Sequence, residues 1–420
     1  MYSLVLDHTT DYRAGKRRLS RIRWILSFIK DGCGKLAASI SNHLYMHSRI
    51  SKRFMAAMAL ISIVSLAVLP TAARAFVGAE QYWFSGEALR LAGADRYETA
   101  TKVSEFEFGY SGAASKIIVA SGENFPDALV AGPLASLLNA PLILTRKDSL
   151  PESASKNIKW VFDGIDDAEP DVYLIGGKNA ISESVEQAIK DLHPNIDVVR
   201  FAGENRVDTS LLVAGQFELS ASVPKTVFIV NGSNFADALS ASGPASDRGV
   251  DYDLSPILLN DSVDSLNPNL QTWLETRFSI DKIKNIWLVG GSAVIGDAIY
   301  TQLGTLASMH GSSVSYLGLA GSNRYETSIK VADQFYGPNI TSLGVASGET
   351  FADALVGGQD SGKSFISNNQ QAFIITHPDA VDSTLLQFLT QRAQALTTAV
   401  VYGGEQAVSN TVVEAIESYL

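Results

Sequence analysis

The chain has 420 residues, of which 46% are hydrophobic and 18% are charged, a balance that excludes an intrinsically disordered protein and a multispan membrane protein. Charge is unevenly distributed along it. Residues 1–75 hold 12 of the 33 basic residues and only three of the 44 acidic ones, so residues 76–420 carry a formal net charge of −20.

The N-terminal segment has the order of a secretory signal. A basic stretch, SRISKRF, precedes an apolar run at 54–69 and the sequence Ala73-Arg74-Ala75, which predicts cleavage after Ala75. The run of about 16 residues is short for a membrane span, with a retained anchor helix as the alternative. Because the 45 residues before Met46 are long for a signal, we expect translation to begin at Met46 or Met55.

Removal of this segment also removes the single cysteine, Cys33. The exported protein would then have no cysteine, which excludes a disulfide framework and a thiol nucleophile. We expect no membrane partner after cleavage.

Beyond a lead-in at 76–88, short apolar strands alternate with helices. Strands are predicted at 89–92, 117–120, 142–144 and 172–175. Helices are predicted at 96–106, 125–139, 152–162 and 183–192, with a capping box at 149–152 and Ser182 as the cap of the last helix. Strict alternation of this kind predicts an α/β fold with a parallel sheet covered by helices on both faces.

The same order of strands, helices and sequence motifs occurs three times along the chain. The opening phrases are RLAGADRYETA (90–100), RFAGENRVDTS (200–210) and GLAGSNRYETS (318–328), and they are followed by SGENFPDAL (121–129), NGSNFADAL (231–239) and SGETFADAL (347–355). A double glycine then follows a strand in each copy, at 176–177, 290–291 and 403–404. We therefore predict three domain-sized repeats, at 89–197, 198–314 and 315–420, each able to hold its own core.

Each opening phrase places an arginine directly after the carboxyl end of a strand, with a threonine one helical turn later. The arginines are Arg96, Arg206 and Arg324. Ligands bind at this edge of open parallel sheets, and a guanidinium offers a planar fork for a carboxylate, a phosphate or a sugar hydroxyl. The alternative is a structural arginine that bridges to a neighbouring repeat or to a paired aspartate.

Each second phrase places an aspartate in the first turn of a helix. These residues are Asp127, Asp237 and Asp353. One interpretation is stabilisation of the free N–H groups of the helix, and the other is an acceptor for ligand hydroxyls beside the arginine. We expect the phenylalanines two residues earlier to fill the core, and the double glycines either to make tight turns or to present N–H groups to an anion.

Signs of other chemistry are weak. Residues 357–364 fit the phosphate-loop pattern GxxxxGKS, but the glycines lie within or beyond the predicted helix rather than between strand and helix, so we expect no nucleotide partner. No histidine occupies a shared position and no metal-ligand spacing appears, so we expect no cofactor. Three copies of one surface favour avid binding over turnover.

Together these motifs make residues 89–420 resemble the cell wall-binding repeat family, type two, of Gram-positive surface proteins. The resemblance implies three tandem Rossmann-like modules packed as a pseudo-threefold triangle, which hold an anionic wall polysaccharide noncovalently and usually tether another domain. It points to the three arginines, the three aspartates and the strand-end residues Ser121, Asn231 and Ser347 as ligand-binding. The copies differ, because Val207 stands where the others have Tyr97 and Tyr325, and Ala372 replaces a proline.

The main hypothesis is an exported, non-enzymatic protein that anchors to the cell wall. A net charge of −20 would repel an anionic polymer, but screening over about 8 Å leaves room for local arginine-bearing clefts. One alternative is a secreted wall hydrolase, with Asp251 and Asp253 as candidate acids. Another is a surface-layer or adhesive subunit whose partner is protein; no nucleic acid partner is expected.

Overall fold

The computed structural model describes residues 87–109, 112–163, 170–219, 225–247, 254–280, 282–363 and 371–420. All belong to one compact unit, Ala75–Leu420. The expected signal, the candidate start sites, and Asp251 and Asp253 lie outside the described residues. Within the described ranges, no helix has the length and apolar character needed to cross a membrane.

Strands and helices alternate throughout this unit. The strands are β1 (Ala88–Leu91), β2 (Lys116–Ser121), β3 (Leu142–Thr145), β4 (Asp171–Ile175), β5 (Asp197–Phe201), β6 (Thr226–Asn231), β7 (Ile257–Asn260), β8 (Asn285–Val289), β9 (Ser315–Leu319), β10 (Ser342–Ser347), β11 (Gln371–Thr376) and β12 (Thr398–Tyr402). The helices of the first copy are α4 (Arg96–Phe108), α5 (Phe125–Leu129), α6 (Ala131–Leu138), α7 (Glu152–Phe162) and α8 (Glu183–Lys190). Those of the second are α9 (Arg206–Glu218), α10 (Phe235–Ala238), the 3-10 turn η2 (Leu239–Ala241), α11 (Ser242–Ser246), α12 (Pro268–Ser279) and α13 (Asp297–Met309). The third copy contributes α14 (Arg324–Tyr336), α15 (Phe351–Lys363), α16 (Ser383–Arg392) and α17 (Asn410–Glu417).

The strands form three four-stranded parallel sheets, in the orders β3-β2-β4-β5, β7-β6-β8-β9 and β1-β12-β10-β11. The predicted α/β class with three parallel sheets is confirmed. In each sheet, however, one of the two edge strands, here called the outer strand, is the opening strand of the next repeat: β5, β9 and, closing the cycle by pairing with β12, β1. The sheets are thus offset by one strand from the repeats predicted at 89–197, 198–314 and 315–420. The reason is local. After β4 the chain passes through α8 and forms β5 beside β4, and after β8 it passes through α13 and forms β9 beside β8, as parallel crossovers do.

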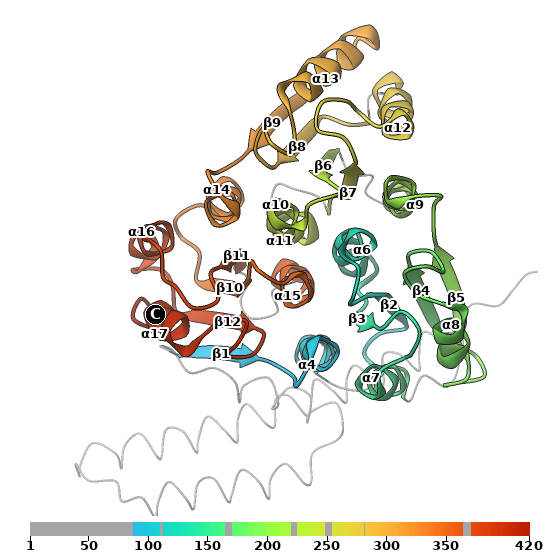
Figure 1. The fold of residues 1–420 in the computed structure, drawn as a ribbon, viewed down its shortest axis with the longest axis vertical. Coiled ribbons are helices and arrows are strands. Elements are labelled where there is room, and N and C mark those ends of the chain that lie inside the picture. Colours follow the sequence, from blue (N-terminus) through green and yellow to red (C-terminus); the bar gives the residue numbers. More distant parts are fainter. Residues whose placement is uncertain are drawn as a thin grey trace, which may run out of the picture. The chain divides into compact units, whose positions relative to one another are not determined.

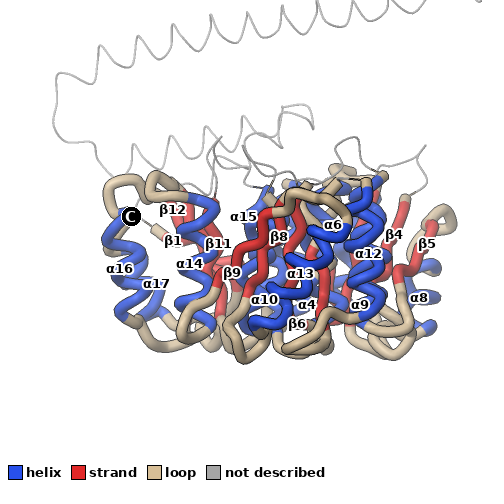
Figure 2. The backbone as a smooth tube through the Cα atoms, turned by 90° about the horizontal axis from the view of Figure 1, so that it is seen from above, coloured by secondary structure: helices blue, strands red, loops and turns tan. Residues whose placement is uncertain are grey.

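The three sheets surround a centre of helices, α6, α11 and α15 (Figure 1). Viewed from above, the strands lie between layers of helices (Figure 2). The largest hydrophobic cluster contains residues of all three copies, such as Leu134, Leu239 and Leu355. The expectation of a separate core for each copy is therefore wrong for the second copy, whose core is continuous with the inner cores of the other two.

Small residues allow the central helices to approach closely. A Cβ added at Gly358 would clash with the Ser242 side chain, and one at Gly362 would clash with Ser246. These glycines of the phosphate-loop pattern lie inside α15, as the sequence argument required. Their role in this fold is helix packing.

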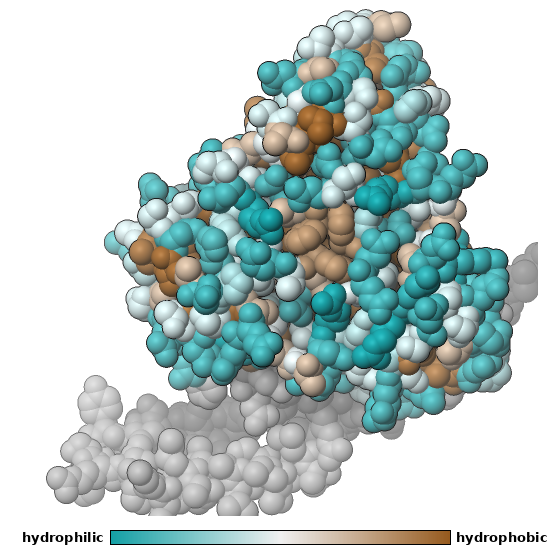
Figure 3. Space-filling view, in the orientation of Figure 1, coloured by the Kyte–Doolittle hydropathy of each residue, from teal (hydrophilic) through white to brown (hydrophobic). Residues whose placement is uncertain are grey.

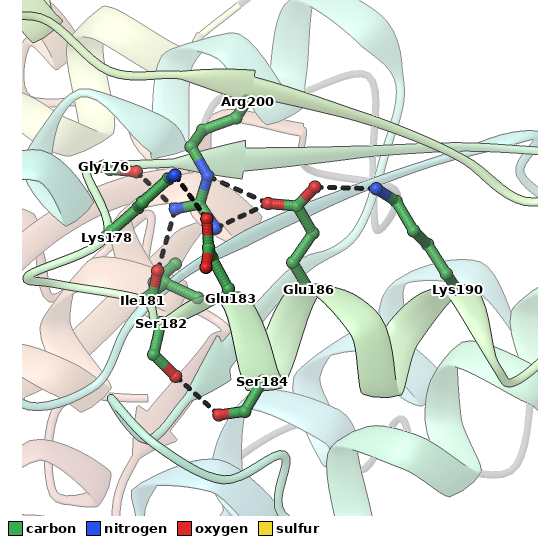
Figure 4. Close-up of polar contacts among 9 residues, drawn as sticks. All are labelled: Gly176, Lys178, Ile181, Ser182, Glu183, Ser184, Glu186, Lys190 and Arg200. Atoms are coloured by element: carbon green, nitrogen blue, oxygen red, sulfur yellow. Dashed lines mark hydrogen bonds and ion pairs between the residues drawn. The ribbon is translucent and has the colours of Figure 1, made fainter.

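Two details of the predicted helices differ from the structure. The single helix expected at 125–139 is interrupted at Val130 between α5 and α6, whereas its counterpart in the third copy is continuous. The capping box at 149–152 is also wrong, because Pro151 occupies the N-cap and no side chain caps α7. Ser182 does occupy the N-cap of α8, but its hydroxyl bonds to that of Ser184 (2.7 Å) rather than to a backbone N–H (Figure 4).

Candidate functional site

The three phenylalanines of the second phrase meet one another at the centre of the molecule. We call Phe125, Phe235 and Phe351 the Phe triangle. Their ring centroids lie 5.4, 6.1 and 6.2 Å apart, with interplanar angles of 58–61°. Each ring is only half-buried, because it begins a helix at the carboxyl edge of the sheets. Apolar atoms gather at the middle of this face, between α6, α10 and α15, within a polar surround (Figure 3).

The three arginines of the opening phrases surround this triangle. Each begins a helix, and its Nη1 donates to the carbonyl of the glycine after the neighbouring strand; these are Gly122 (2.5 Å), Gly232 and Gly348 (2.6 Å). The guanidinium of Arg96 lies 5.6 Å from the ring centroid of Phe351, and that of Arg324 lies 5.7 Å from Phe235. In these two cases, the arginine lies over the phenylalanine of the repeat before it, in cyclic order.

The aspartates follow the same cyclic order. Burial raises the pKa of Asp127, and a hydrogen bond from Thr209 and the charge of Arg206 oppose that rise. Burial likewise raises the pKa of Asp353, opposed by Thr99 and Arg96. The aspartate of one repeat therefore interacts with the arginine of the next, not with the arginine of its own repeat.

Asp237 occupies the matching position in the second copy, with its Oδ2 3.6 Å from the place where a Cβ on Gly290 would lie. The same test on Gly176 and Gly403 gives 2.7 Å to Asp127 and Asp353. Each aspartate is thus in contact with a double-glycine turn. The first glycine of each turn has a positive φ, between 106° and 140°, which favours glycine.

The double glycines make tight turns, and their first N–H groups are already used. Gly176 donates to Phe201, Gly290 to Leu319 and Gly403 to Leu91, at 2.8–3.0 Å. Each acceptor is the last residue of the next repeat's opening strand. These N–H groups therefore hold the outer strand of each sheet and are not presented to an anion.

The strand-end residues predicted as ligand contacts are buried instead. Ser121, Asn231 and Ser347 are 0–6% exposed. Their side-chain oxygens accept hydrogen bonds from the backbone of the following turn, such as Ser121 from Glu123 (3.2 Å) and Asn231 from Ser233 (2.8 Å). Asn231 also donates to the carbonyl of Val294 (2.9 Å), so its larger side chain ties two loops together. These residues therefore fix the turns that border the face, and their own side chains lie beneath its surface.

The margins of the face differ between copies. In the first, the Tyr97 hydroxyl lies 3.5 Å from Glu123 and the Arg146 guanidinium lies 4.6 Å from the Tyr97 ring centroid. In the third, Tyr325 bonds to Glu349, and its ring centroid lies 3.7 Å from that of His377. Burial, followed by the bond to Glu349, raises the pKa of Tyr325. Val207 provides neither contact in the second copy, so the three edges are chemically unequal.

Contact of the arginines with a neighbouring repeat was one of the two interpretations of the sequence, but the cyclic order of the pairing was not predicted. Repetition of the phrases gave the residue types, but adjacent repeats supply the partners, and no spacing within one repeat reveals that. The resulting arrangement has three cations around an apolar, aromatic centre, which suits the binding of an anionic ligand with apolar faces. Within the described ranges, no group of three metal-ligating side chains is present.

Three segments of the chain, residues 90–186, 200–300 and 319–413, match the family model of cell wall binding domain 2. The chain is 26% identical over 329 residues to N-acetylmuramoyl-L-alanine amidase LytC of Bacillus subtilis, covering 78% of this chain and 58% of that protein. It is 29% identical over 286 residues to the amidase enhancer of the same organism, covering 68% of this chain and 34% of that protein.

Solved structures give the same result. Cwp6 of Clostridium difficile matches with a TM-score of 0.67, and Cwp8 of the same organism with 0.66, each at 26% identity and over 79% of this chain. The chain spans 48% and 51% of those two structures, and so about a third to three fifths of all four proteins. The matches establish that the chain belongs to the cell wall binding domain 2 family, and that it is a cell-wall-binding protein of the cell surface.

Proposed function

We propose that the chain holds an anionic polysaccharide of the wall noncovalently, through the face that contains the Phe triangle, Arg96, Arg206 and Arg324. The observation that carries this proposal is the cyclic placement of arginines around an aromatic centre at the carboxyl edge of three sheets. Phenylalanine rings can stack against the apolar faces of sugar rings, while guanidinium groups bind acidic substituents.

The arginines keep donors available for such a ligand. Only Nη1 of Arg96 has a hydrogen-bond acceptor among the described residues, and the same is true of Arg206 and Arg324. In two of the three copies, the charge of the arginine also acts on a buried aspartate of the repeat before it. Local attraction at these positions competes with the overall charge of −20, which is screened over about 8 Å.

The proposed role is anchoring, without catalysis by this chain. Similarity to an amidase lies in the wall-binding region, which is itself non-catalytic. Three linked copies of one edge gain affinity without any new contact, which suits retention on a polymer. Two of the aspartates, which are possible acids in a hydrolase, are instead engaged by threonine and arginine of the next repeat: Asp127 by Thr209 and Arg206, and Asp353 by Thr99 and Arg96.

The test is co-sedimentation of the purified chain with wall fragments. Substitution of Arg96, Arg206 and Arg324 together by glutamine should lower wall retention by about a hundredfold or more, because linked sites are lost together. A matched control changes Lys156, Lys159 and Lys178 to glutamine, which alters the net charge equally on exposed helices and turns and should leave retention unchanged.

Two further measurements separate the alternatives. Walls stripped of secondary polymers should not retain the wild-type chain, and undiminished retention would overturn the polysaccharide proposal. Release of soluble wall fragments by the purified chain would instead identify a hydrolase. Retention that survives the triple arginine change but is lost on protease-treated walls would identify a protein partner.

A further inference from the structure

The outer strands of the three sheets are protected unequally. β1 and β5 begin their opening phrases with Arg90 and Arg200, whereas β9 has Gly318 at the same position. Arg90 donates to the Gly403 carbonyl (2.9 Å), and Arg200 donates to the Gly176 carbonyl (2.8 Å). A charged side chain at a sheet edge discourages pairing with another strand. β9, with the sequence SYLGL, has no charged residue and no proline.

Two tyrosines fill the space that charged side chains take elsewhere. A Cβ on Gly318 would clash with the hydroxyl of Tyr300, and a Cβ on Gly304 would lie 2.7 Å from the hydroxyl of Tyr316. In the first copy, the matching positions hold Arg200, Glu186 and Lys190, which form a bonded charged group (Figure 4). The second copy thus replaces a charged corner by an uncharged one.

This uncharged region is extensive. Residues 298–323, which cover most of α13 and all of β9, contain no Asp, Glu, Lys or Arg. Several of its apolar side chains face solvent: Met309 is 77% exposed, Leu317 47% and Tyr316 37%. In a protein with 41 acidic and 21 basic residues beyond Ala75, this region would give no local charge repulsion between two copies.

The backbone of β9 has its outer hydrogen-bonding groups unpaired within the part of the chain that the structure describes, since β9 ends its sheet. On the inner side, Ser315 donates to Lys284 (2.8 Å) and Leu319 accepts from Gly290 (3.0 Å). The backbone groups of alternate residues point toward the same neighbouring strand. The N–H and C=O groups of Leu317 therefore also point toward β8, and those of Tyr316 and Gly318 point outward.

We propose that β9 pairs antiparallel with β9 of a second copy of this chain, joining two sheets into one of eight strands. The edge is self-complementary about Leu317. With Leu317 opposite its own symmetry mate, Tyr316 lies opposite Gly318 of the second copy, and both outward-facing pairs exchange two hydrogen bonds each. Such a contact is isologous and closes at two copies.

Side chains support the same register. Leu317 is paired with Trp287 of β8, so both lie on one face of the sheet, and Trp287 packs against Phe335 with ring centroids 5.0 Å apart. In the dimer, two exposed leucines become cross-strand neighbours beside this aromatic pair. Because a pair of five-residue strands buries less than the roughly 1,600 Å² of a standard interface, the dimer should be weak and concentration-dependent.

The test is sedimentation equilibrium of the purified chain across a wide concentration range. The wild type should change from one to two chain masses. Leu317→Lys places like charges opposite each other and should raise the dissociation constant by about tenfold or more. Leu386→Lys, at a leucine on α16 that is 38% exposed, is the matched control and should dimerise like the wild type.

A second variant and a second measurement test the hydrogen bonds themselves. Tyr316→Pro removes an outward N–H and leaves the backbone pairing with β8 intact, so it should weaken the dimer. Urea unfolding of the monomer measures the separate cost of losing the Tyr316 ring beside Gly304. In the wild type, hydrogen exchange at the Tyr316 and Gly318 amides should slow as concentration rises. A wild type that stays monomeric at every concentration, equal effects of Leu317→Lys and Leu386→Lys, or unchanged exchange at both amides would each overturn the proposal.

Discussion

The outer strands β5 and β9 occupy equivalent places in two of the sheets but end them in different ways. At β5, the Arg200 side chain extends toward the end of β4 and toward α8, where it binds two carbonyls, Gly176 (2.8 Å) and Ile181 (2.9 Å), as well as Glu186. At β9, glycine and tyrosine fill the same volume without charge. The repeat thus accommodates either a charged arginine–glutamate pair or a glycine with a tyrosine at this position. Only the charged pair discourages pairing with another strand.

The difference between β5 and β9 should decide whether the protein can cross-link wall fragments. In an antiparallel β9 pair, the carboxyl edges of the two copies face opposite sides, so the two wall-binding faces point apart. The wild-type chain should therefore flocculate wall fragments, while Leu317→Lys should bind them equally well without flocculation. Turbidity and co-sedimentation measure the two properties separately, and equal turbidity for both proteins would contradict this geometry.

Making β5 resemble β9 should cost stability. Arg200→Gly removes the bonds to both carbonyls and to Glu186, and its side chain is only 14% exposed, so we expect a loss of about 2–3 kcal/mol in the free energy of unfolding. Urea denaturation measures it. A loss below about 0.5 kcal/mol, the range of ordinary surface changes, would show that Arg200 does not hold this edge.

Making β9 resemble β5 should abolish dimerisation. Gly318→Arg alone would clash with Tyr300, so we expect a loss of about 1–3 kcal/mol in the free energy of unfolding, as in overpacked sites. Adding Tyr300→Glu removes the clash and supplies a partner, so the double variant should recover stability and remain monomeric. Urea unfolding measures the change in stability, and sedimentation measures dimerisation. A double variant that still dimerises would contradict the role of charge.

Acid should weaken the β5 corner and spare the β9 corner. A hydrogen bond from Lys190, together with that from Arg200, lowers the pKa of Glu186 below its usual 4.5 against the effect of burial. The folded pKa is therefore below the unfolded one, so this stabilisation is complete above about pH 4.5 and is lost as pH falls through the folded pKa.

Urea midpoints measured between about pH 3 and 6 test this difference. Glu186→Gln should flatten the fall of stability in acid. Tyr300→Phe is the control for the β9 corner: burial raises the pKa of Tyr300 above 10, so this group stays neutral throughout the range. A flattening by Tyr300→Phe as large as that by Glu186→Gln would contradict the comparison.

The smallest effect is expected from Lys178, which pairs with Glu183 beside the same corner (Figure 4). Both side chains are more than 60% exposed, so solvent screens the pair. Lys178→Ala should leave the urea midpoint unchanged within error. A clear decrease would mean that the surrounding charges act as one network with Arg200.

The sequence was a good guide wherever the reason for a structure is local. Strand β4 and helices α4 and α8 lie within a few residues of their predicted ranges because apolar runs and helix starts are set by neighbouring residues. The positions of the arginines at strand ends followed from the same reasoning. The family resemblance, which the comparisons bear out, rested on phrases repeated at a fixed spacing.

Several features could not be read from one repeat. The break at Val130, the N-cap at Pro151 and the bond of Ser182 to Ser184 all differ from what the local pattern predicts. The burial of Ser121, Asn231 and Ser347 follows from a turn that folds over the strand end. Sequence spacing gives the distance along the chain, not the direction of a side chain.

By itself, then, the sequence determined the repeat count, the α/β class and the residue types at each strand end, because these depend on local patterns. Only the tertiary structure decided that each sheet takes its outer strand from the next repeat, that Asp127 interacts with Arg206 and Asp353 with Arg96, and that β9 is an outer strand without a charged residue. The physical reason is that strand pairing and burial join residues far apart in the chain, and a cyclic arrangement supplies partners that no single repeat contains.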